Sequence, residues 1–264
     1  MHRLRVVSAL VLVLPFLLVV QFGSPLHLHL LVSVAILLCG WEFAWLCPGG
    51  GDAGVAVLTV VGSLAWQWLM VRGFPPTLIA PMAAAAVLVR VLVRREAFRT
   101  GVIRAAWTVL GVAFVGGLFS YGALLRNHED GRQLIYFLTC TTWAGDIGAY
   151  YVGSRVGRRP LAPRISPKKT VEGALGGIAA PMLVAALGQA WIWPGLPLGT
   201  AIWAGGVLAV VGMLGDLTES AIKRAADVKD SGRLIPGHGG VLDRLDSLFF
   251  AGPVLYALRW LGWV

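Results

Sequence analysis

The chain has 264 residues, of which 57% are hydrophobic and 13% are charged. Soluble domains are about 45–50% apolar and about 25% charged, so this chain has too little polar surface for a water-soluble globule. The 22 basic residues exceed the 13 acidic ones and give a net charge of +9. The arginines cluster between apolar runs, which suits anionic lipid headgroups, and no zinc-finger or RNP-type motif supports nucleic-acid binding. The three cysteines include no CxxC, so they indicate neither a disulfide framework nor a zinc site.

The apolar runs predict an all-α, polytopic membrane protein with about nine transmembrane helices. A helix needs about 20 apolar residues to cross the hydrocarbon core, and helices leave no backbone group unsatisfied there. Arg3 and Arg5 precede the first run as in a signal peptide, but no small-residue cleavage site follows, so we expect an uncleaved span. The expected spans are 4–20, 28–46, 53–71, 76–93, 103–125, 133–153, 173–192, 198–215 and 247–263.

The distribution of basic residues predicts the orientation of these spans. Lys and Arg accumulate in cytoplasmic loops. With nine spans, one side of the membrane carries the amino terminus and the basic loops that follow the fourth, sixth and eighth spans, whereas the other side carries only four arginines. We therefore expect a cytoplasmic amino terminus and two long cytoplasmic loops, 154–172 and 215–247. A plasma-membrane (inner, cytoplasmic) location follows, with any site in these loops facing the cytoplasm.

Polar residues of types that can take part in catalysis or bind ligands are concentrated in the second half of the chain. We expect residues 1–140 to form a scaffold of apolar helices and residues 141–264 to form the catalytic half. The whole chain contains only four lysines, and all of them fall in the two long loops. A lysine is a compact charge suited to phosphate, so these loops predict a phosphate-binding site. The alternative is that they are ordinary loop charges near lipid headgroups. The lysines are Lys168, Lys169, Lys223 and Lys229.

The stretch 215–230 is predicted to be a helix with one polar face. Four polar side chains recur at i, i+4, i+7 and i+11, a spacing that places them on the same face of a helix. These residues are Asp216, Ser220, Lys223 and Asp227. Such a face suits a divalent cation and the phosphate oxygens that it bridges. The alternative is a stabilised surface helix with an i,i+4 salt bridge between Glu219 and Lys223.

A glycine-rich turn and two carboxylates follow this stretch. Residues 236–240 read PGHGG, and glycines allow tight turns whose free amide groups bind anionic oxygens. Asp243 and Asp246 lie three residues apart at the start of the last span, and carboxylates in this arrangement favour Mg²⁺. His238, between glycines, is a candidate for contacting phosphate or handling a proton.

A second group of polar residues lies between 143 and 173. Asp146 falls within an expected span, and a buried carboxylate there indicates function or a structural hydrogen bond to another helix. The segment ISPKKTVEG (165–173) places Ser166 and Thr170 where a helix start needs capping hydroxyls, with Lys168 and Lys169 available for phosphate. The glycines at 173, 176 and 177 should allow close helix packing.

These motifs together resemble the phosphatidate cytidylyltransferase family, also called CDP-diacylglycerol synthases. The resemblance covers about residues 143–247, in the order WxxDxxAY, ISPKKTxEG and a long carboxy-terminal signature, with no departure at the charged positions. The signature residues are Ser220, Lys223, Arg224, Lys229, Asp230, Gly232, Pro236, His238, Gly239, Gly240, Asp243, Arg244 and Asp246.

The resemblance implies a reaction of CTP with phosphatidate that gives CDP-diacylglycerol and pyrophosphate. It also implies Mg²⁺, with a second cation such as K⁺, and a homodimer in the lipid membrane. On this basis we predict metal ligands at Asp146, Asp216, Asp243 and Asp246. We predict catalytic residues at Lys223, Lys229, Asp230, His238 and Arg244. We predict substrate contacts at Ser166, Lys168, Lys169, Thr170, Ser220, Arg224, Gly239 and Gly240.

Two other functions remain as alternatives. A CTP-dependent polyprenol or lipid kinase could use similar loops on a different lipid. A secondary transporter could use Asp146 in an ion path, although the charges gather on one side and no internal repeat is visible. The DGxxAR…GxxxDxxxD pattern of CDP-alcohol phosphatidyltransferases is absent from the sequence.

Overall fold

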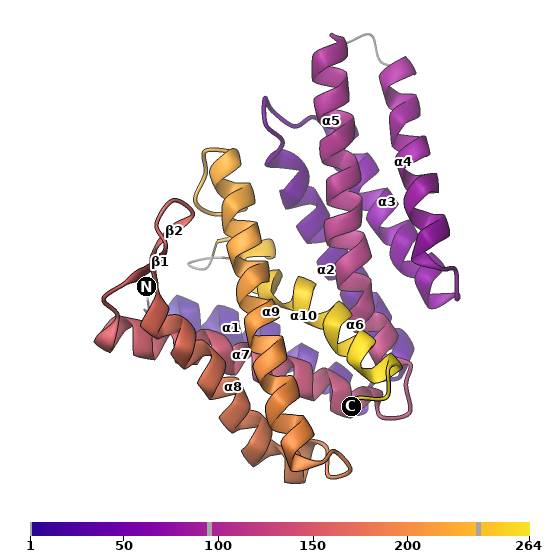
Figure 1. The fold of residues 1–264 in the computed structure, drawn as a ribbon. Coiled ribbons are helices and arrows are strands. Elements are labelled where there is room, and N and C mark those ends of the chain that lie inside the picture. Colours follow the sequence, from indigo (N-terminus) through magenta and orange to yellow (C-terminus); the bar gives the residue numbers. More distant parts are fainter. Residues whose placement is uncertain (1, 94–96, 236–238) are drawn as a thin grey trace. The chain divides into compact units, whose positions relative to one another are not determined.

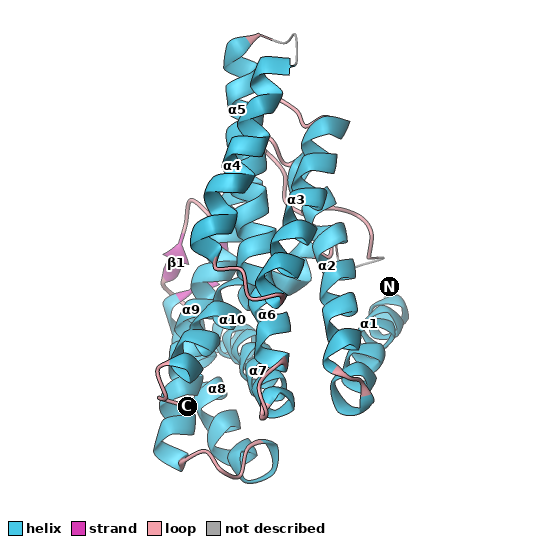
Figure 2. Cartoon of the chain, turned by 90° about the vertical axis from the view of Figure 1, so that its right-hand side faces the viewer, coloured by secondary structure: helices cyan, strands magenta, loops and turns pink. Residues whose placement is uncertain are grey.

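The computed structural model describes residues 2–93, 97–235 and 239–264, and these are overwhelmingly helical (Figures 1 and 2). The helices are α1 His2–Phe22, α2 Pro25–Trp45, α3 Ala53–Val71, α4 Pro76–Val93, α5 Phe98–Gly111, the π-helix η1 Val112–Leu118, α6 Phe119–Arg126, α7 Gly131–Val156, α8 Val171–Ile192, α9 Leu198–Ala225 and α10 Leu242–Trp260. Two short antiparallel strands, β1 Pro160–Ala162 and β2 Ser166–Thr170, form a hairpin between α7 and α8. The predicted all-α membrane fold is confirmed, with this small hairpin added.

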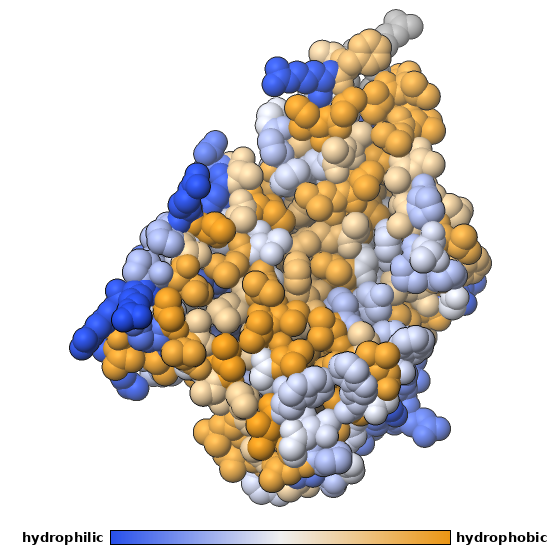
Figure 3. All heavy atoms as spheres, viewed as in Figure 1, coloured by the Kyte–Doolittle hydropathy of each residue, from blue (hydrophilic) through white to orange (hydrophobic). Residues whose placement is uncertain are grey.

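Helices occupy all nine expected spans, and six of the described segments are long and apolar enough to cross a membrane. These six are α2, α3, α4, the continuous segment Phe98–Arg126, α8 and α9. Large hydrophobic side chains are exposed along them, and Figure 3 shows apolar side chains over much of the helical surface. Such exposure is typical of contact with lipid rather than water. The count of nine and the cytoplasmic amino terminus remain predictions.

The chain divides into two compact units that do not follow the order of the sequence. The first unit comprises Met1–Leu124 and Ala225–Leu245, and the second comprises Leu125–Arg224 and Asp246–Val264. The predicted division into a scaffold and a catalytic half concerns roles rather than packing, and it remains a prediction.

In the first unit, α3 packs against α2, α5 and η1 (Figure 1). The rings of Phe43 and Trp107 stack with centroids 4.9 Å apart. Asp52 caps α3 by accepting a hydrogen bond from the Val55 amide at 2.8 Å, and it pairs with two guanidinium groups, Arg90 at 2.7 Å and Arg104 at 3.0 Å. The loop before α3 is therefore tied to the neighbouring helices by charge-assisted contacts.

In the second unit, α7 and α8 form an extensive helix pair. Glycines make this contact possible, because a Cβ atom at Gly148 would lie 2.5 Å from the carbonyl oxygen of Gly176. At Gly173 and Gly177 a Cβ atom would also approach the α7 backbone, at 3.0 Å from the Ala149 oxygen and 3.2 Å from the Gly145 oxygen. The close packing predicted from these small residues is confirmed.

Candidate functional site

The β1–β2 hairpin is fixed at the start of α8 by side-chain caps. Thr170 is the N-cap residue, and its Oγ1 accepts a hydrogen bond from the Gly173 amide at 3.1 Å. The Glu172 carboxylate accepts hydrogen bonds from the amides of Arg158 at 2.9 Å and Arg159 at 3.2 Å. The predicted capping role of Thr170 is confirmed. Ser166, in contrast, begins β2 and does not cap a helix.

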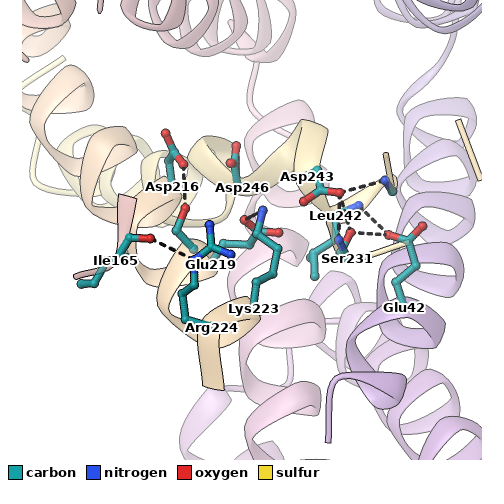
Figure 4. Close-up of polar contacts among 12 residues, drawn as sticks. Glu42, Ile165, Asp216, Glu219, Lys223, Arg224, Ser231, Leu242, Asp243 and Asp246 are labelled. Carbon is teal, nitrogen blue, oxygen red and sulfur yellow. Dashed lines mark hydrogen bonds and ion pairs between the residues drawn. The ribbon is translucent and has the colours of Figure 1, made fainter. Parts of the chain in front are cut away.

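Two further contacts tie the hairpin to α9. Lys169 forms an ion pair with Asp216. Arg224 donates a hydrogen bond from Nε to the Ile165 carbonyl oxygen at 3.2 Å (Figure 4). Lys168 is exposed beside Lys169. The structure therefore brings together two positions that the sequence separates, a loop lysine and a helix carboxylate. Both belong to the predicted site.

On α9, three of the four residues of the predicted polar face lie on the helix. The Ser220 hydroxyl donates to Asp216 Oδ1 at 3.5 Å, and Lys223 pairs with the fully buried Glu219 at 2.5 Å. The i,i+4 salt bridge weighed as the alternative is therefore present. The expected span 198–215 and the predicted helix 215–230 form one continuous helix, and only the predicted end is wrong, because α9 ends at Ala225. Asp227 lies beyond it with φ of 56°, a left-handed conformation that Asp tolerates and that ends a helix.

Asp246 lies close to Asp216 because α9 and α10 meet at a glycine. A Cβ atom at Gly215 would lie 2.7 Å from the carbonyl oxygen of Asp246. Asp246 precedes the apolar run expected to span the membrane from residue 247. Burial, followed by the negative charge of Asp216 and the weaker effect of Asp146, raises the pKa of the Asp246 carboxyl to about 7. Carboxylates that oppose one another's ionisation are stabilised by a bound cation.

Asp146 lies on α7, within the expected span 133–153, and its side chain is on the outer surface of that helix. The adjacent Trp143 is also exposed. A carboxylate on a spanning helix is costly whether it faces lipid or other helices, so the functional role of Asp146 remains a prediction. Its negative charge contributes to the raised pKa of the Asp246 carboxyl, which links it to the candidate site.

The carboxylates of the second unit fit a hard cation by chemistry but do not form a complete protein cage. Among the described residues, no three His, Cys, Asp or Glu side chains are grouped so that they could hold a metal ion. Mg²⁺ usually keeps several waters and binds through one or two carboxylates plus substrate phosphates. The neighbouring Asp216 and Asp246, which offer only oxygen ligands, match that pattern.

Asp243, the other predicted metal ligand of α10, is bound to the loop before the helix. Its Oδ2 accepts hydrogen bonds from the Ser231 amide at 3.0 Å, the Ser231 hydroxyl at 3.0 Å and the Gly240 amide at 2.8 Å (Figure 4). The expectation that the Gly240 amide is free for an anionic ligand is therefore wrong. Any metal contact by Asp243 would use its other oxygen.

The other predicted site residues of this loop differ in exposure and in backbone conformation. Lys229, Asp230 and Arg244 are exposed. Gly239 has φ of +84°, which explains the requirement for glycine there. His238 lies outside the described residues.

Sequence reasoning missed one residue that the structure places at the centre of this loop. Glu42, on α2, is buried and accepts hydrogen bonds from Ser231, Val241 and Leu242. A signal was present, because a carboxylate within the expected span 28–46 indicates function by the argument applied to Asp146. The scaffold interpretation of residues 1–140 obscured it.

Apolar spanning helices, together with paired lysine and carboxylate side chains on a hairpin and α9, define a polytopic membrane protein suited to anionic ligands. More specifically, the chain belongs to the cytidylyltransferase family, whose model matches residues 3–261.

Curated relatives agree with this family. The chain is similar to phosphatidate cytidylyltransferases of Bacillus subtilis (strain 168), with 44% identity over 150 residues and 56% of each chain covered, and of Synechocystis sp., with 48% identity over 132 residues. The second match covers 50% of this chain and 44% of the relative. The chain thus spans about half the length of these two relatives. A Staphylococcus haemolyticus phosphatidate cytidylyltransferase is 33% identical over 260 residues, 97% of each chain.

Proposed function

We propose that this protein is a phosphatidate cytidylyltransferase, which converts CTP and phosphatidate to CDP-diacylglycerol and pyrophosphate. A phosphate oxygen of phosphatidate attacks the α-phosphorus of CTP and forms a new P–O bond. The bond from the α-phosphorus to the bridging oxygen breaks, and pyrophosphate leaves with the electron pair. The family and the names of its relatives support this reaction. The structural observation that carries it is the Lys169–Asp216 pair beside Asp246.

Cationic side chains of the second unit would stabilise the phosphates. Catalysis of phosphoryl-type transfer is mostly positioning and electrostatic stabilisation. Lys169 lies within reach of α9, Lys168 is exposed beside it, and Lys223 and Arg224 follow on α9. The attacking phosphate oxygen is already anionic, so the reaction requires no strong general base. The absence of an activated Ser or Cys arrangement among the predicted site residues is consistent with this.

Asp216 and Asp246 are the proposed Mg²⁺ ligands, with Asp146 and Asp243 as further candidates. Bound Mg²⁺ would neutralise developing negative charge on the transferring group and its leaving group. In the described structure Asp216 pairs with Lys169, so cation binding would release this lysine toward the substrate phosphates. A second cation such as K⁺ remains part of the proposal without an assigned residue.

The loop before α10 contains further predicted catalytic residues. Lys229, Asp230 and Arg244 are exposed, and Lys229 and Arg244 carry the positive charge that suits an anionic substrate. His238 and Gly239 are proposed to contact phosphate oxygens. Ser166 and Ser220 are proposed to orient substrate oxygens in the second unit.

We propose that the protein acts in the inner (cytoplasmic) membrane with the site facing the cytoplasm, where CTP is present. The accumulation of Lys and Arg in the two long loops supports this orientation. A homodimer, implied by family resemblance, is also proposed. Its stoichiometry can be measured by the mass of the protein in lipid nanodiscs.

The decisive experiment uses purified protein in liposomes with phosphatidate, Mg²⁺ and CTP labelled at the α-phosphate. Labelled CDP-diacylglycerol in the organic phase, with equal release of pyrophosphate, is the expected result. Conversion of CTP to CDP with a polyprenol would instead indicate the lipid kinase. No turnover with either lipid would contradict both enzymatic functions.

A further inference from the structure

Glu42 connects the amino-terminal helices of the first unit to the loop before α10. The residue is buried on α2, at 6% exposure, and its three hydrogen-bond donors lie about 190–200 residues later in the chain. Glu42 Oε1 accepts from the Val241 amide at 3.0 Å. Glu42 Oε2 accepts from the Leu242 amide at 2.9 Å and from the Ser231 hydroxyl at 3.1 Å.

Two of these donors are the amides at the start of α10, which begins at Leu242. The first amides of a helix have no partner within the helix, and negative charge is stabilising at this end. Glu42 therefore caps α10 from a different helix. Both carboxylate oxygens are used, so a neutral amide side chain cannot replace them completely.

The glycines of the loop are explained by the same carboxylate. A Cβ atom at Gly232 would lie 2.5 Å from Glu42 Oε1, and one at Gly240 would collide with Glu42 and Ser231. These glycines make room for a protein carboxylate. The interpretation of the Gly240 position as a phosphate contact is thus replaced by a packing requirement.

Glu42 and Asp243 both accept hydrogen bonds from the loop before α10. The Ser231 hydroxyl lies 3.1 Å from Glu42 Oε2 and 3.0 Å from Asp243 Oδ2, and with one proton it donates to one of them at a time. Asp243 also accepts from the Gly240 amide, which precedes the two amides bound by Glu42. The backbone from Gly240 to Leu242 is therefore held at three consecutive amides by two carboxylates.

We propose that Glu42 is a positioning residue for the cytidylyltransferase reaction. It fixes the Gly240–Leu242 backbone and so sets the orientation of the first turn of α10, which carries Asp243 and Arg244. Glu42 touches no substrate in this role. The inference rests on the proposed function for its kinetic part, whereas the structural part stands on the hydrogen bonds alone.

The test compares Glu42→Gln and Glu42→Ala with wild-type protein in phosphatidate liposomes. Misplacement of catalytic groups by about 1 Å can cost about 100-fold in rate, so we expect kcat to fall about 100-fold for Glu42→Ala. Glu42→Gln keeps one acceptor oxygen, so we expect a smaller loss, about tenfold. We expect the KM for CTP to change less than about threefold, because Glu42 contacts no substrate.

Asp52→Asn is the matched control. Asp52 is also a carboxylate that caps a helix of the first unit, but it lies outside the proposed site. We expect this variant to lose thermal stability because it loses the ionic contacts with Arg90 and Arg104. We expect its kcat to stay within about twofold of wild type, because the contacts of Asp52 with Val55, Arg90 and Arg104 do not involve the loop before α10. An equal loss of kcat in Asp52→Asn and Glu42→Gln would overturn the proposal, as would unchanged kcat in folded Glu42→Ala.

Amide hydrogen exchange separates this inference from the proposed function. In both Glu42 variants we expect faster exchange at Gly240, Val241 and Leu242, and in Asp52→Asn we expect it only near Val55. If wild-type protein makes no CDP-diacylglycerol, the proposed function fails. Faster exchange confined to residues 240–242 in the Glu42 variants would still show that Glu42 fixes this backbone. Unchanged exchange at these amides would overturn the positioning role whatever the activity.

Discussion

Lys169 on strand β2 forms an ion pair with Asp216 on helix α9, and so joins the two long polar loops of the sequence. The hairpin that carries Lys169 is held by the Thr170 cap and by the hydrogen bond from Arg224 to Ile165. These contacts fix the Lys169 ammonium group beside the Asp216 carboxylate, next to the proposed substrate phosphates. This arrangement distinguishes Lys169 from its neighbour Lys168.

The two lysines should respond differently to substitution. We expect Lys169→Ala to lower kcat/KM for CTP by about 100-fold or more, as removal of one pre-positioned donor does. We expect Lys168→Ala to cost about tenfold or less, because an exposed, solvated charge contributes less. Initial rates over a range of CTP concentrations measure both. Equal losses would show that the Asp216 pairing does not distinguish the two lysines.

Loss of either proposed cation ligand should remove most activity. A bound metal ion supplies several kcal/mol of charge stabilisation, so we expect Asp216→Asn and Asp246→Asn each to lower kcat by about 100- to 1,000-fold. Both variants should also need more Mg²⁺ for half-maximal rate. The control is Asp130→Asn, which breaks a pair with Arg259 at 3.1 Å outside the site. A normal Mg²⁺ requirement in both site variants would contradict the assignment.

The buried Glu219–Lys223 pair should affect stability strongly. Glu219 is fully buried and Lys223 is 12% exposed, so Glu219→Ala leaves a positive charge with little water around it. Removal of one partner of a buried pair costs about 3–5 kcal/mol, whereas replacement of both by apolar residues is often neutral. We expect thermal unfolding in detergent to show a large loss for Glu219→Ala and recovery in Glu219→Met/Lys223→Met. A double variant as unstable as the single one would refute this explanation.

Asp52 should make stability depend on pH. Burial opposes ionisation of Asp52, but the Val55 amide and the charges of Arg90 and Arg104 outweigh it and hold the pKa of the carboxyl below its usual value. The stabilisation is therefore present above the unfolded-state pKa of about 3.9 and is lost as pH falls through the lower folded-state pKa. We expect wild-type protein to unfold at a higher temperature than Asp52→Asn at pH 7, and the difference to shrink below about pH 4. A constant difference across this range would contradict the ionic contribution.

Much of the second-unit site follows from local chemistry in the sequence. The Thr170 cap is set by a hydroxyl three residues before Gly173, and the close α7–α8 contact is set by glycines. The Glu219–Lys223 pair follows from a spacing of four in a helix. Each of these depends on residues near one another in the chain or on residue size, so the sequence contains the necessary information.

The errors arose where a distant segment decides the outcome. The Gly240 amide and the glycines around it were interpreted as ligand contacts, because the sequence does not show that Glu42 fills the space beside them. The end of α9 at Ala225 instead of residue 230 coincides with the left-handed backbone of Asp227.

The sequence by itself therefore determined the membrane class, the helical segments and the family resemblance, and it supplied the charged candidates for the site. These depend on composition and on spacing along one helix or loop. Only the tertiary structure decided which carboxylate meets which partner: Asp216 with Lys169, Asp243 with Ser231, and Glu42 with the start of α10. The physical reason is that a hydrogen bond or ion pair requires atoms within about 3–4 Å, and hydropathy and spacing do not specify the distance between residues far apart in the chain.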